Sequence, residues 1–464
     1  MRIVVCVKQR ADGDLNPFDA CAYEAALRIS GSEVILLSMA PEKSREMLLS
    51  LTRLGAKEAY LLCDKAFAGA DTLATSYALS KALEKLKPQL VFCGRQTVDG
   101  DTGQVGPGLS EFMKMSLVTG VMKINSADES AISCIDRAGE EKTVNYPALL
   151  TIERINDLRL PSIRSRVGNV TVWSASDIGA DVTRCGLKGS PTQVIRSFES
   201  NTDKRRCTFV SAKDLLSLIE KGIADDKKRE EKPVQSGEKL KNLWIIGDKP
   251  YEYAKSVSDD IRIVEKLDPE IIADMIRKED PSVVLWDSSP WSKQAAARVA
   301  VMLGTGLCAD CTSLETDGEK LFMYRPAFSG NIIAKIVCKT RPQMATVRTG
   351  EDNASEVMIS IGKGARDAVS EIRAFAEKLD AEIVASRGAV DSDMADYPMQ
   401  IGLTGRCVTP PVYIAVGISG AVHHIVGMKN SGIVIAINND KNATIFDYAD
   451  YGIIGDAKEI FDKL

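Results

Sequence analysis

The chain contains only two histidines, His423 and His424, which lie side by side just after the glycine-rich turn GISG (417–420). The two glycines permit a tight turn between a strand and a helix, and Ser419 can cap that helix. A helix N-terminus favours a pyrophosphate, and an imidazole in the first turn can partner an anion or an electron-rich ring. Adjacent helical residues do not share a face, so at most one imidazole is expected to point at a ligand. Because paired histidines are more often incidental than functional, the motif needs support from elsewhere.

Three further motifs in the same region have the composition of a nucleotide site. SIGKGARD (360–367) puts Gly-Lys-Gly between a strand and a helix, where free N–H groups favour a phosphate. SRGAVDSD (386–393) follows the carboxyl end of a strand, where open α/β sheets bind ligands. The glycines of QIGLTGRCVTPP (400–411) allow the backbone to approach a flat ligand. Each motif alone is equally well or better interpreted as a turn, a surface arginine or a plain loop; together they indicate a dinucleotide site whose chemistry belongs to the cofactor.

A second candidate site lies in the N-terminal half. The loop DGDTGQVG (99–106) comes shortly after the apolar strand LVFCG (90–94), and it can bring N–H groups to a phosphate and carboxylates to hydroxyls. Residues 87–121 and 280–311 share an order of proline, strand, loop and helix, which predicts an internal repeat of about 190 residues. The second copy has SSPWSK in place of the loop, so only the first copy is expected to bind a nucleotide there.

Other site chemistries find little support. Cys308 and Cys311 have the CxxC spacing of a redox or metal pair, but without a second pair or a nearby histidine the favoured interpretation is incidental cysteines. No nucleophile–base set is recognisable, so neither catalytic residues nor a metal site is predicted. Eleven scattered cysteines do not form a disulfide framework, which indicates a reducing cytoplasm.

The composition is that of a globular protein with several domains. The chain has 464 residues, 45% of them apolar, and a net charge of −5, which argues against nucleic acid as a partner. The apolar run in MRIVVCVKQR (1–10) is too short for a signal peptide, and no segment has about 18 uninterrupted apolar residues, so no membrane span is expected.

Alternation of apolar strand-like runs with amphipathic helical stretches predicts mainly parallel sheets wrapped in helices. Residues 222–241 are charged and poor in apolar residues, which is typical of a linker. The predicted organisation is a domain over 1–221, this linker, a domain over 242–355, and a compact doubly wound domain over 356–464.

Several motifs resemble one family. ASRGAVDSD, QIGLTGRCVTPPVYIAVGISGAVHHIVGMKNS, IVIAINND and FDYADYGIIGD resemble the FAD-binding domain of the electron-transfer flavoprotein α subunit, and YRPAFSGNI (324–332) its N-terminal domain. VKQ, NPFDACAYEAALRI, GRQTVDGDTGQVGP, LRLPSI and GLKGSPTQV resemble the β subunit, in order. The resemblance implies fused subunits with β first. It also implies an α/β fold with two related adenine-nucleotide-hydrolase-like parallel-sheet domains and a doubly wound FAD-binding domain.

The resemblance also implies an FAD site. Arg387 would lie over the isoalloxazine, Thr404 near the flavin N5, and His424 near the C2 carbonyl. Lys363 replaces the usual arginine and Leu403 a common glutamine, so phosphate binding and redox potential are open to change. The implied FAD site consists of Lys363, Ser386, Arg387, Gln400, Ile401, Gly402, Leu403, Thr404, Ser419, Gly420, Ala421, Val422, His423, His424, Asn438 and Asp456.

The β-like half is expected to hold a second adenine nucleotide. This is AMP in simple family members and a second FAD in electron-bifurcating ones; the motifs look closer to the bifurcating kind, so FAD is favoured and AMP stays open. The matching positions are Cys6, Val7, Asn16, Pro17, Phe18, Asp19, Met39, Gln96, Thr97, Val98, Asp99, Gly100, Asp101, Thr102, Gly103, Gln104, Val105 and Gly106.

The function implied by the resemblance is electron transfer. The protein would accept electrons from an acyl-CoA dehydrogenase type of flavin dehydrogenase or from NADH, and would pass them to an acceptor oxidoreductase. The flavin domain is expected to swivel around residues 350–358, and the segment 186–198 to act as a docking or clasping arm. An NADH-oxidising bifurcating enzyme and a non-redox adenine-nucleotide sensor are the alternatives, and self-association is left open.

Overall fold

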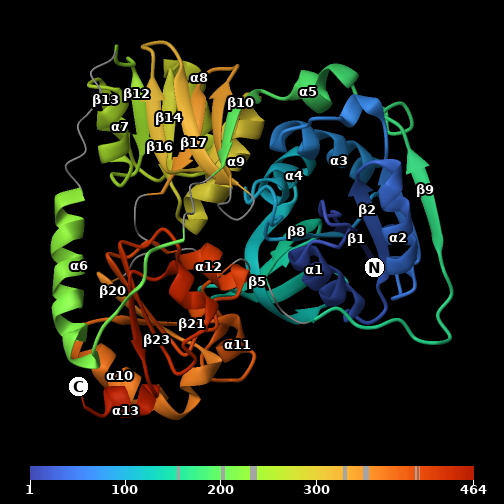
Figure 1. The fold of residues 1–464 in the computed structure, drawn as a ribbon. Coiled ribbons are helices and arrows are strands. Elements are labelled where there is room, and N and C mark those ends of the chain that lie inside the picture. Colours follow the sequence, from blue (N-terminus) through green and yellow to red (C-terminus); the bar gives the residue numbers. More distant parts are fainter. Residues whose placement is uncertain are drawn as a thin grey trace. The chain divides into compact units, whose positions relative to one another are not determined.

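The computed structural model describes residues 1–153, 157–199, 204–229, 238–327, 332–348, 355–402, 405–406 and 408–463. The chain forms two compact units (Figure 1). Unit 1 comprises Met1–Phe198, Ser236–Phe328 and Ile332–Thr349, and unit 2 comprises Glu199–Gln235, Ser329–Asn331 and Gly350–Leu464. The predicted α/β class with several mainly parallel sheets is confirmed.

The first sheet of unit 1 has nine strands in the order β7-β6-β5-β8-β4-β1-β2-β3-β9. Strands β5 to β7 pair antiparallel, and the other neighbours pair in parallel. The strands are β1 (Arg2–Cys6), β2 (Glu33–Met39), β3 (Glu58–Leu62), β4 (Leu90–Gly94), β5 (Ser116–Ala127), β6 (Ala131–Asp136), β7 (Glu141–Asn145), β8 (Ala148–Ile152) and β9 (Asn169–Trp173). The helices are α1 (Pro17–Leu27), α2 (Arg45–Thr52), α3 (Thr72–Leu86) and α4 (Val105–Met113).

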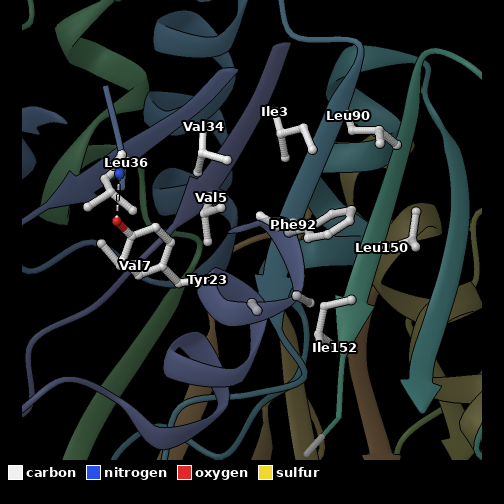
Figure 2. Packing of buried hydrophobic residues seen from close by; sticks show 14 of the residues in the cluster. Ile3, Val5, Val7, Tyr23, Val34, Leu36, Leu90, Phe92, Leu150 and Ile152 are labelled. Atoms are coloured by element: carbon white, nitrogen blue, oxygen red, sulfur yellow. Dashed lines mark hydrogen bonds between the residues drawn. The ribbon is translucent and has the colours of Figure 1, made fainter. Parts of the chain in front are cut away.

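Both faces of this sheet are buried, which explains the continuous apolar runs of its central strands. In β1, Ile3 and Val5 pack with α1 and α2 on one face, whereas Val4 and Cys6 pack with α3 and α4 on the other. Figure 2 shows the apolar cluster on the face covered by α1 and α2, in which the Tyr23 ring lies beside the strands. The Tyr23 hydroxyl donates to the Leu51 carbonyl at 2.8 Å and accepts from a backbone N–H, so its burial leaves no polar group unsatisfied.

A second copy of the same design follows in unit 1. Its five strands have the order β13-β12-β14-β19-β15, equivalent to β2-β1-β4-β8-β5 of the first copy, as the predicted internal repeat requires. The strands are β12 (Leu243–Ile246), β13 (Ile261–Val264), β14 (Val283–Asp287), β15 (Leu307–Cys311) and β19 (Gln343–Val347), and the helices α7 (Tyr251–Val257), α8 (Pro269–Glu279) and α9 (Pro290–Leu303).

A four-stranded sheet in the order β10-β18-β17-β16 completes unit 1. Its members are β10 (Thr192–Glu199), β16 (Ser313–Thr316), β17 (Leu321–Ala327) and β18 (Ile332–Cys338), and the short helix α5 (Gly186–Gly189) precedes β10. The predicted arm over 186–198 therefore forms part of unit 1.

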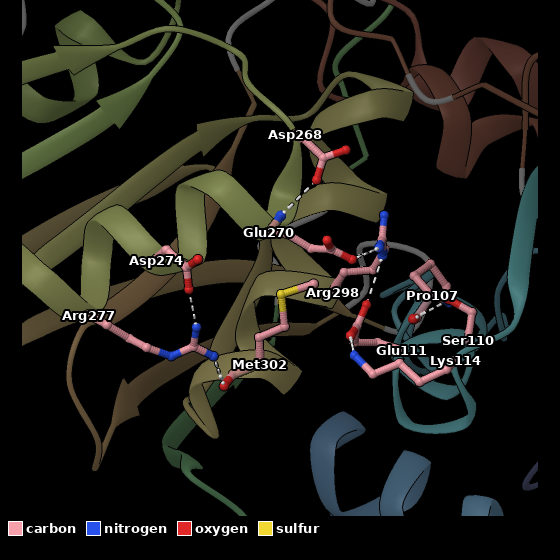
Figure 3. A network of polar contacts seen from close by, with 10 residues as sticks. All are labelled: Pro107, Ser110, Glu111, Lys114, Asp268, Glu270, Asp274, Arg277, Arg298 and Met302. Carbon is pink, nitrogen blue, oxygen red and sulfur yellow. Dashed lines mark hydrogen bonds and ion pairs between the residues drawn. The ribbon is translucent and has the colours of Figure 1, made fainter.

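The equivalent helices α4 and α9 of the two copies pack against each other through a polar network (Figure 3). The Glu111 side chain is 3% exposed and accepts a hydrogen bond from the Arg298 Nε at 3.0 Å. Lys114 is a second partner of the same carboxylate. Because a buried carboxylate needs such partners, this network favours one arrangement of the two copies.

Unit 2 is a doubly wound domain. Its parallel sheet has the order β11-β24-β23-β22-β20-β21. The strands are β11 (Thr208–Phe209), β20 (Val357–Ile361), β21 (Glu382–Ala385), β22 (Val412–Val416), β23 (Ile433–Asn438) and β24 (Tyr451–Ile454). The helices are α6 (Leu215–Arg229), α10 (Val369–Leu379), α11 (Arg387–Val390), α12 (Val422–Met428) and α13 (Ala457–Phe461).

The units divide the chain differently from the predicted domains. Residues 222–229 of the expected linker continue helix α6, and residues 204–221 belong to unit 2 rather than to an N-terminal domain. Arg205 donates hydrogen bonds to the carbonyls of Lys429 and Ser431, and β11 extends the sheet at β24. The charged composition masked the helical pattern because only one side of the helix is apolar, and that side, with Leu215, Leu218 and Ile219, packs into the core of unit 2. Of the expected hinge around 350–358, residues 350–354 lie outside the described part of the chain.

Candidate cofactor site

The switch point of the unit 2 sheet lies between β20 and β22, where the strand order reverses. The two glycine motifs follow these strands and pack backbone against backbone: the Gly362 N–H donates to the Val416 carbonyl at 2.7 Å, and the Gly364 N–H to the Gly417 carbonyl at 3.1 Å. A Cβ on Gly362 would lie 2.1 Å from the Gly417 oxygen. The motifs therefore serve close packing of two turns, and this packing brings them together at the ligand edge of the sheet.

Lys363 and the Ser386–Arg387 pair converge at this edge. A Cβ on Gly388 would lie 3.9 Å from the Lys363 Cβ, and the Ser386 N–H donates to the Ile361 carbonyl at 2.9 Å. The Ser386 hydroxyl caps α11, and the half-exposed Arg387 pairs with Asp391 at 3.3 Å. Two cationic side chains thus lie at the strand ends, in positions suited to an anionic ligand.

The loop after residue 399 packs against the start of α12. Gln400 and Ile401 are buried, and the Ile401 N–H donates to the Ala385 carbonyl at 2.8 Å. Gly402 has a φ of +136°, and a Cβ there would lie 2.5 Å from the His423 carbonyl oxygen. Leu403 and Thr404 lie outside the described residues.

The two histidines differ as the helical geometry predicts. His423 is exposed, whereas His424 is 5% exposed and its Nε2 lies 3.0 Å from the Tyr413 hydroxyl. Burial lowers the pKa of His424 to about 4, against a smaller opposing effect of the Ile401 backbone, so the imidazole is neutral at pH 7. Its Nδ1 is buried and makes no hydrogen bond of ordinary geometry. A half-bonded buried imidazole fits a ligand with polar ring atoms, as a flavin has.

The remaining predicted residues lie along the same edge. Asn438 ends β23 and donates to the Ile418 carbonyl at 2.9 Å, and Asp456 follows β24 and caps α13. The N-cap of α12 is Ala421 and no side chain caps it, so the predicted capping role of Ser419 is wrong. The turn extends further than expected because Gly420, with a φ of +91°, packs on the Ile445 backbone.

The second predicted site lies at the switch point between β1 and β4. Asn16 is fully buried; its side chain donates to the Gln96 carbonyl at 3.0 Å and accepts from the Val98 N–H at 3.3 Å. Asp19 accepts from the Lys8 and Gly94 N–H groups, and burial raises the Asp19 pKa to about 7. These contacts hold the loop after β4 in place.

Other members surround this switch point. Cys6 and Met39 end their strands, Lys8 pairs with Asp99 at 2.8 Å, and Val105 begins α4. The Gln104 side chain accepts from the Thr72 hydroxyl at 2.6 Å, so part of this loop is bonded within the protein.

At the equivalent point of the second copy, which is the carboxyl end of β14, Lys266 and Asp287 form an ion pair. Asp287 is fully buried at the end of β14. Burial opposes its ionisation, but hydrogen bonds from Lys266 and Ser289 outweigh it and lower the Asp287 pKa to about 2. The Asp287 carboxylate therefore takes its hydrogen bonds from within the protein.

Four residues, Tyr413, Arg325, Leu160 and Ile163, were given no role from the sequence. Tyr413 lies within an apolar strand and gave no signal. Arg325, 6% exposed on β17, donates to the Gly100 carbonyl at 2.7 Å. Leu160 and Ile163 are 89% and 101% exposed. Both lie in the motif LRLPSI, whose proline indicates a loop.

No helix in the described part of the chain is both long and apolar enough to span a membrane. Likewise, no group of metal-ligating side chains occurs among the described residues.

The sheet order, the paired glycine turns and the half-bonded imidazole define unit 2 as a doubly wound domain for a nucleotide cofactor. Comparison with family models is more specific: the model described as electron transfer flavoprotein domain matches residues 3–178, and that described as electron transfer flavoprotein FAD-binding domain matches residues 353–429. The chain therefore belongs to the electron transfer flavoprotein family, with a β-like half fused ahead of an α-like half, and its C-terminal region is an FAD-binding domain.

Curated relatives agree with the fusion. The chain is 42% identical over 229 residues to the caffeyl-CoA reductase-Etf complex subunit CarD of Acetobacterium woodii, covering 43% of this chain and 87% of that protein. It is 37% identical over 248 residues to protein FixA of Azorhizobium caulinodans, covering 45% and 88%. It is 34% identical over 244 residues to the electron transfer flavoprotein subunit alpha of Clostridium acetobutylicum, covering 42% and 73%.

Proposed function

We propose that the chain is an FAD-containing electron carrier, which accepts electrons from a flavin dehydrogenase of the acyl-CoA dehydrogenase type or from NADH and delivers them to an acceptor oxidoreductase. The observation that supports the proposal is that the segments carrying Lys363, Arg387 and the buried His424 follow three adjacent parallel strands, β20, β21 and β22, of an FAD-binding domain. FAD bound there would supply the redox chemistry, accepting and releasing electrons one or two at a time.

The side chains have separable roles in this proposal. Arg387 places a positive charge where the ligand gains negative charge on reduction, and Lys363 offers a point charge to a phosphate. His424 is neutral, so it acts by hydrogen bonding rather than as a cation. Contacts from Leu403 and Thr404 belong to the proposal, although both lie outside the described residues.

We further propose that unit 1 binds a second FAD, with AMP as the alternative occupant. The support is the resemblance of the NPFDACAYEAALRI and DGDTGQVGP segments to bifurcating family members, and the relative named as part of a reductase–Etf complex. Buried Asn16 and Asp19 order the loop that would contact the nucleotide. A second FAD would extend the function to flavin-based bifurcation with NADH oxidation, whereas AMP would imply a simple carrier.

The loop between β8 and β9 is the proposed partner contact. Leu160 and Ile163 are almost fully exposed, and the exposed Arg164 and Arg166 lie beside them in the chain, whereas Arg159 is paired with the buried Glu24 at 2.9 Å. Exposed apolar side chains within a basic segment suit a partner surface with an apolar pocket and an acidic rim. An acidic flavin dehydrogenase surface is the occupant that we propose.

The test is cofactor analysis of the purified full chain. Its visible spectrum is recorded, and FAD and AMP released by denaturation are then counted per chain. Two FAD and no AMP would support bifurcation, and NADH oxidation would be assayed next; one FAD with one AMP would support the simple carrier. A colourless protein that takes up no added FAD would contradict the main proposal and favour a non-redox adenine-nucleotide sensor.

A further inference from the structure

We propose that Tyr413 is a positioning residue, which donates its hydroxyl proton to His424 Nε2 and so holds this imidazole in the tautomer that carries its proton on Nδ1. The inference rests on the proposed function insofar as it assigns Nδ1 to the flavin. The hydrogen bond itself is a property of the protein without cofactor.

Both partners are fixed by the fold. Tyr413 lies in β22 at the middle of the unit 2 sheet and is fully buried. His424 lies in the first turn of α12, where its N–H donates to the Ala421 carbonyl at 2.9 Å. The Tyr413 oxygen and His424 Nε2 are 3.0 Å apart, and the ring centroids are 6.2 Å apart. The contact therefore joins a rigid strand to the turn that carries the candidate ligand group.

The direction of this hydrogen bond follows from acid–base chemistry. Burial raises the pKa of the Tyr413 hydroxyl and lowers that of His424, so both groups are neutral at pH 7. A neutral imidazole has one donor and one acceptor nitrogen, and the acceptor nitrogen is a better base than a phenol oxygen. The phenol therefore donates to Nε2, which leaves the imidazole proton on Nδ1.

The consequence is a directed donor. Nδ1 is buried and makes no hydrogen bond of ordinary geometry, and the Ile401 backbone affects the His424 pKa less than burial does, so an Nδ1–H keeps capacity for an acceptor on the ligand. A flavin carbonyl oxygen is such an acceptor, and it becomes a stronger one as the ring gains electrons. Without the tyrosine hydroxyl, the imidazole is free to tautomerise, and either form leaves a buried nitrogen without a partner.

The experiment uses histidine labelled with 15N in the full chain without flavin. Only two imidazoles contribute signals, and a His423→Gln variant assigns them. At pH 7 we expect His424 to show a protonated Nδ1 and an unprotonated Nε2, and the Tyr413→Phe variant to show averaged shifts from mixed tautomers. Tyr451→Phe is the matched control: it lies in the same sheet and bonds Lys221 instead, so it should leave the His424 spectrum unchanged.

A second readout concerns the cofactor. FAD titrated into the unloaded protein should bind about tenfold more weakly to the Tyr413→Phe variant than to the native chain. A His424 proton on Nε2 in the native chain would overturn the inference, even if the variant failed to fold. So would an unchanged tautomer in a folded Tyr413→Phe protein. If the native chain binds no FAD but shows the Nδ1 proton, the proposed function fails and the positioning contact stands.

Discussion

In unit 1 the Arg325 guanidinium donates a hydrogen bond to the Gly100 carbonyl, with an Nη2–O distance of 2.7 Å. Gly100 lies in the first copy of the internal repeat and Arg325 on β17, next to the second copy. Arg325 is 6% exposed. The loop proposed to bind the second nucleotide is thus held from outside its own sheet.

Replacing Arg325 by Met should therefore weaken the binding of the second nucleotide to unit 1 while leaving the FAD of unit 2 bound. Without this contact the loop is more mobile in the free protein, so ordering it on binding costs more entropy. We therefore expect the second nucleotide to be retained about tenfold less tightly. Nucleotide content per chain after dialysis measures this. The control is Arg262→Met, which removes a surface ion pair with Glu279 in the same unit. Equal second-nucleotide content in the two variants would show that the Gly100 contact is not needed.

The Glu111–Arg298 pair should matter for the stability of unit 1. Arg298→Met removes a hydrogen-bonded partner from a buried carboxylate, which should lower the free energy of unfolding by about 2 kcal/mol. Arg277→Met removes the exposed partner of Asp274 (Figure 3) and should cost less than about 1 kcal/mol.

The measurement is urea unfolding followed by tryptophan fluorescence. All four tryptophans lie in unit 1, so their emission reports this unit alone; they are Trp173, Trp244, Trp286 and Trp291. Similar losses in the two arginine variants would mean that burial of Glu111 adds nothing to the pair.

Unit 2 should lose stability in acid because of His424. Its pKa is about 4 in the folded chain and near 6.5 in the unfolded one, so protons bind preferentially to the unfolded state between these values. The contribution is complete above pH 6.5 and is lost as the pH falls to 4, by about 3 kcal/mol in total.

His424→Gln should flatten this part of the pH dependence, whereas His423→Gln, at an exposed position, should not. Unfolding in urea at several pH values can be followed by hydrogen exchange of unit 2 amides. A His424→Gln profile that matches the native one would contradict the assigned burial.

The Leu160–Ile163 loop is predicted to act in partner docking only. A Leu160→Ser/Ile163→Ser double variant should raise the KM for an acyl-CoA dehydrogenase about tenfold through lost apolar contact. Its FAD content and its reduction by dithionite should stay unchanged, since both side chains are exposed and support no core. Unaltered kinetics with the dehydrogenase would place the contact elsewhere, and added salt should weaken the native interaction if the arginines contribute.

The sequence by itself determined the local structure: apolar alternation specifies strands such as β1, and the GKG and GISG motifs specify turns after strands. It also placed most of the FAD motifs at one sheet edge, because the carboxyl ends of parallel strands lie at the same edge of a sheet. It could not place residues 204–229 in unit 2. The apolar face of helix α6 is stabilised by packing against residues more than 100 positions further along the chain, and no local pattern indicates them.

Only the tertiary structure decided which side chains meet. The Tyr413–His424 and Arg325–Gly100 contacts join residues from separate elements, the second pair 225 positions apart, and neither partner has a local pattern that points to the other. A turn or a strand is specified by neighbours within a few residues. A hydrogen bond between elements depends on register, packing and burial, which exist only when the whole core is formed.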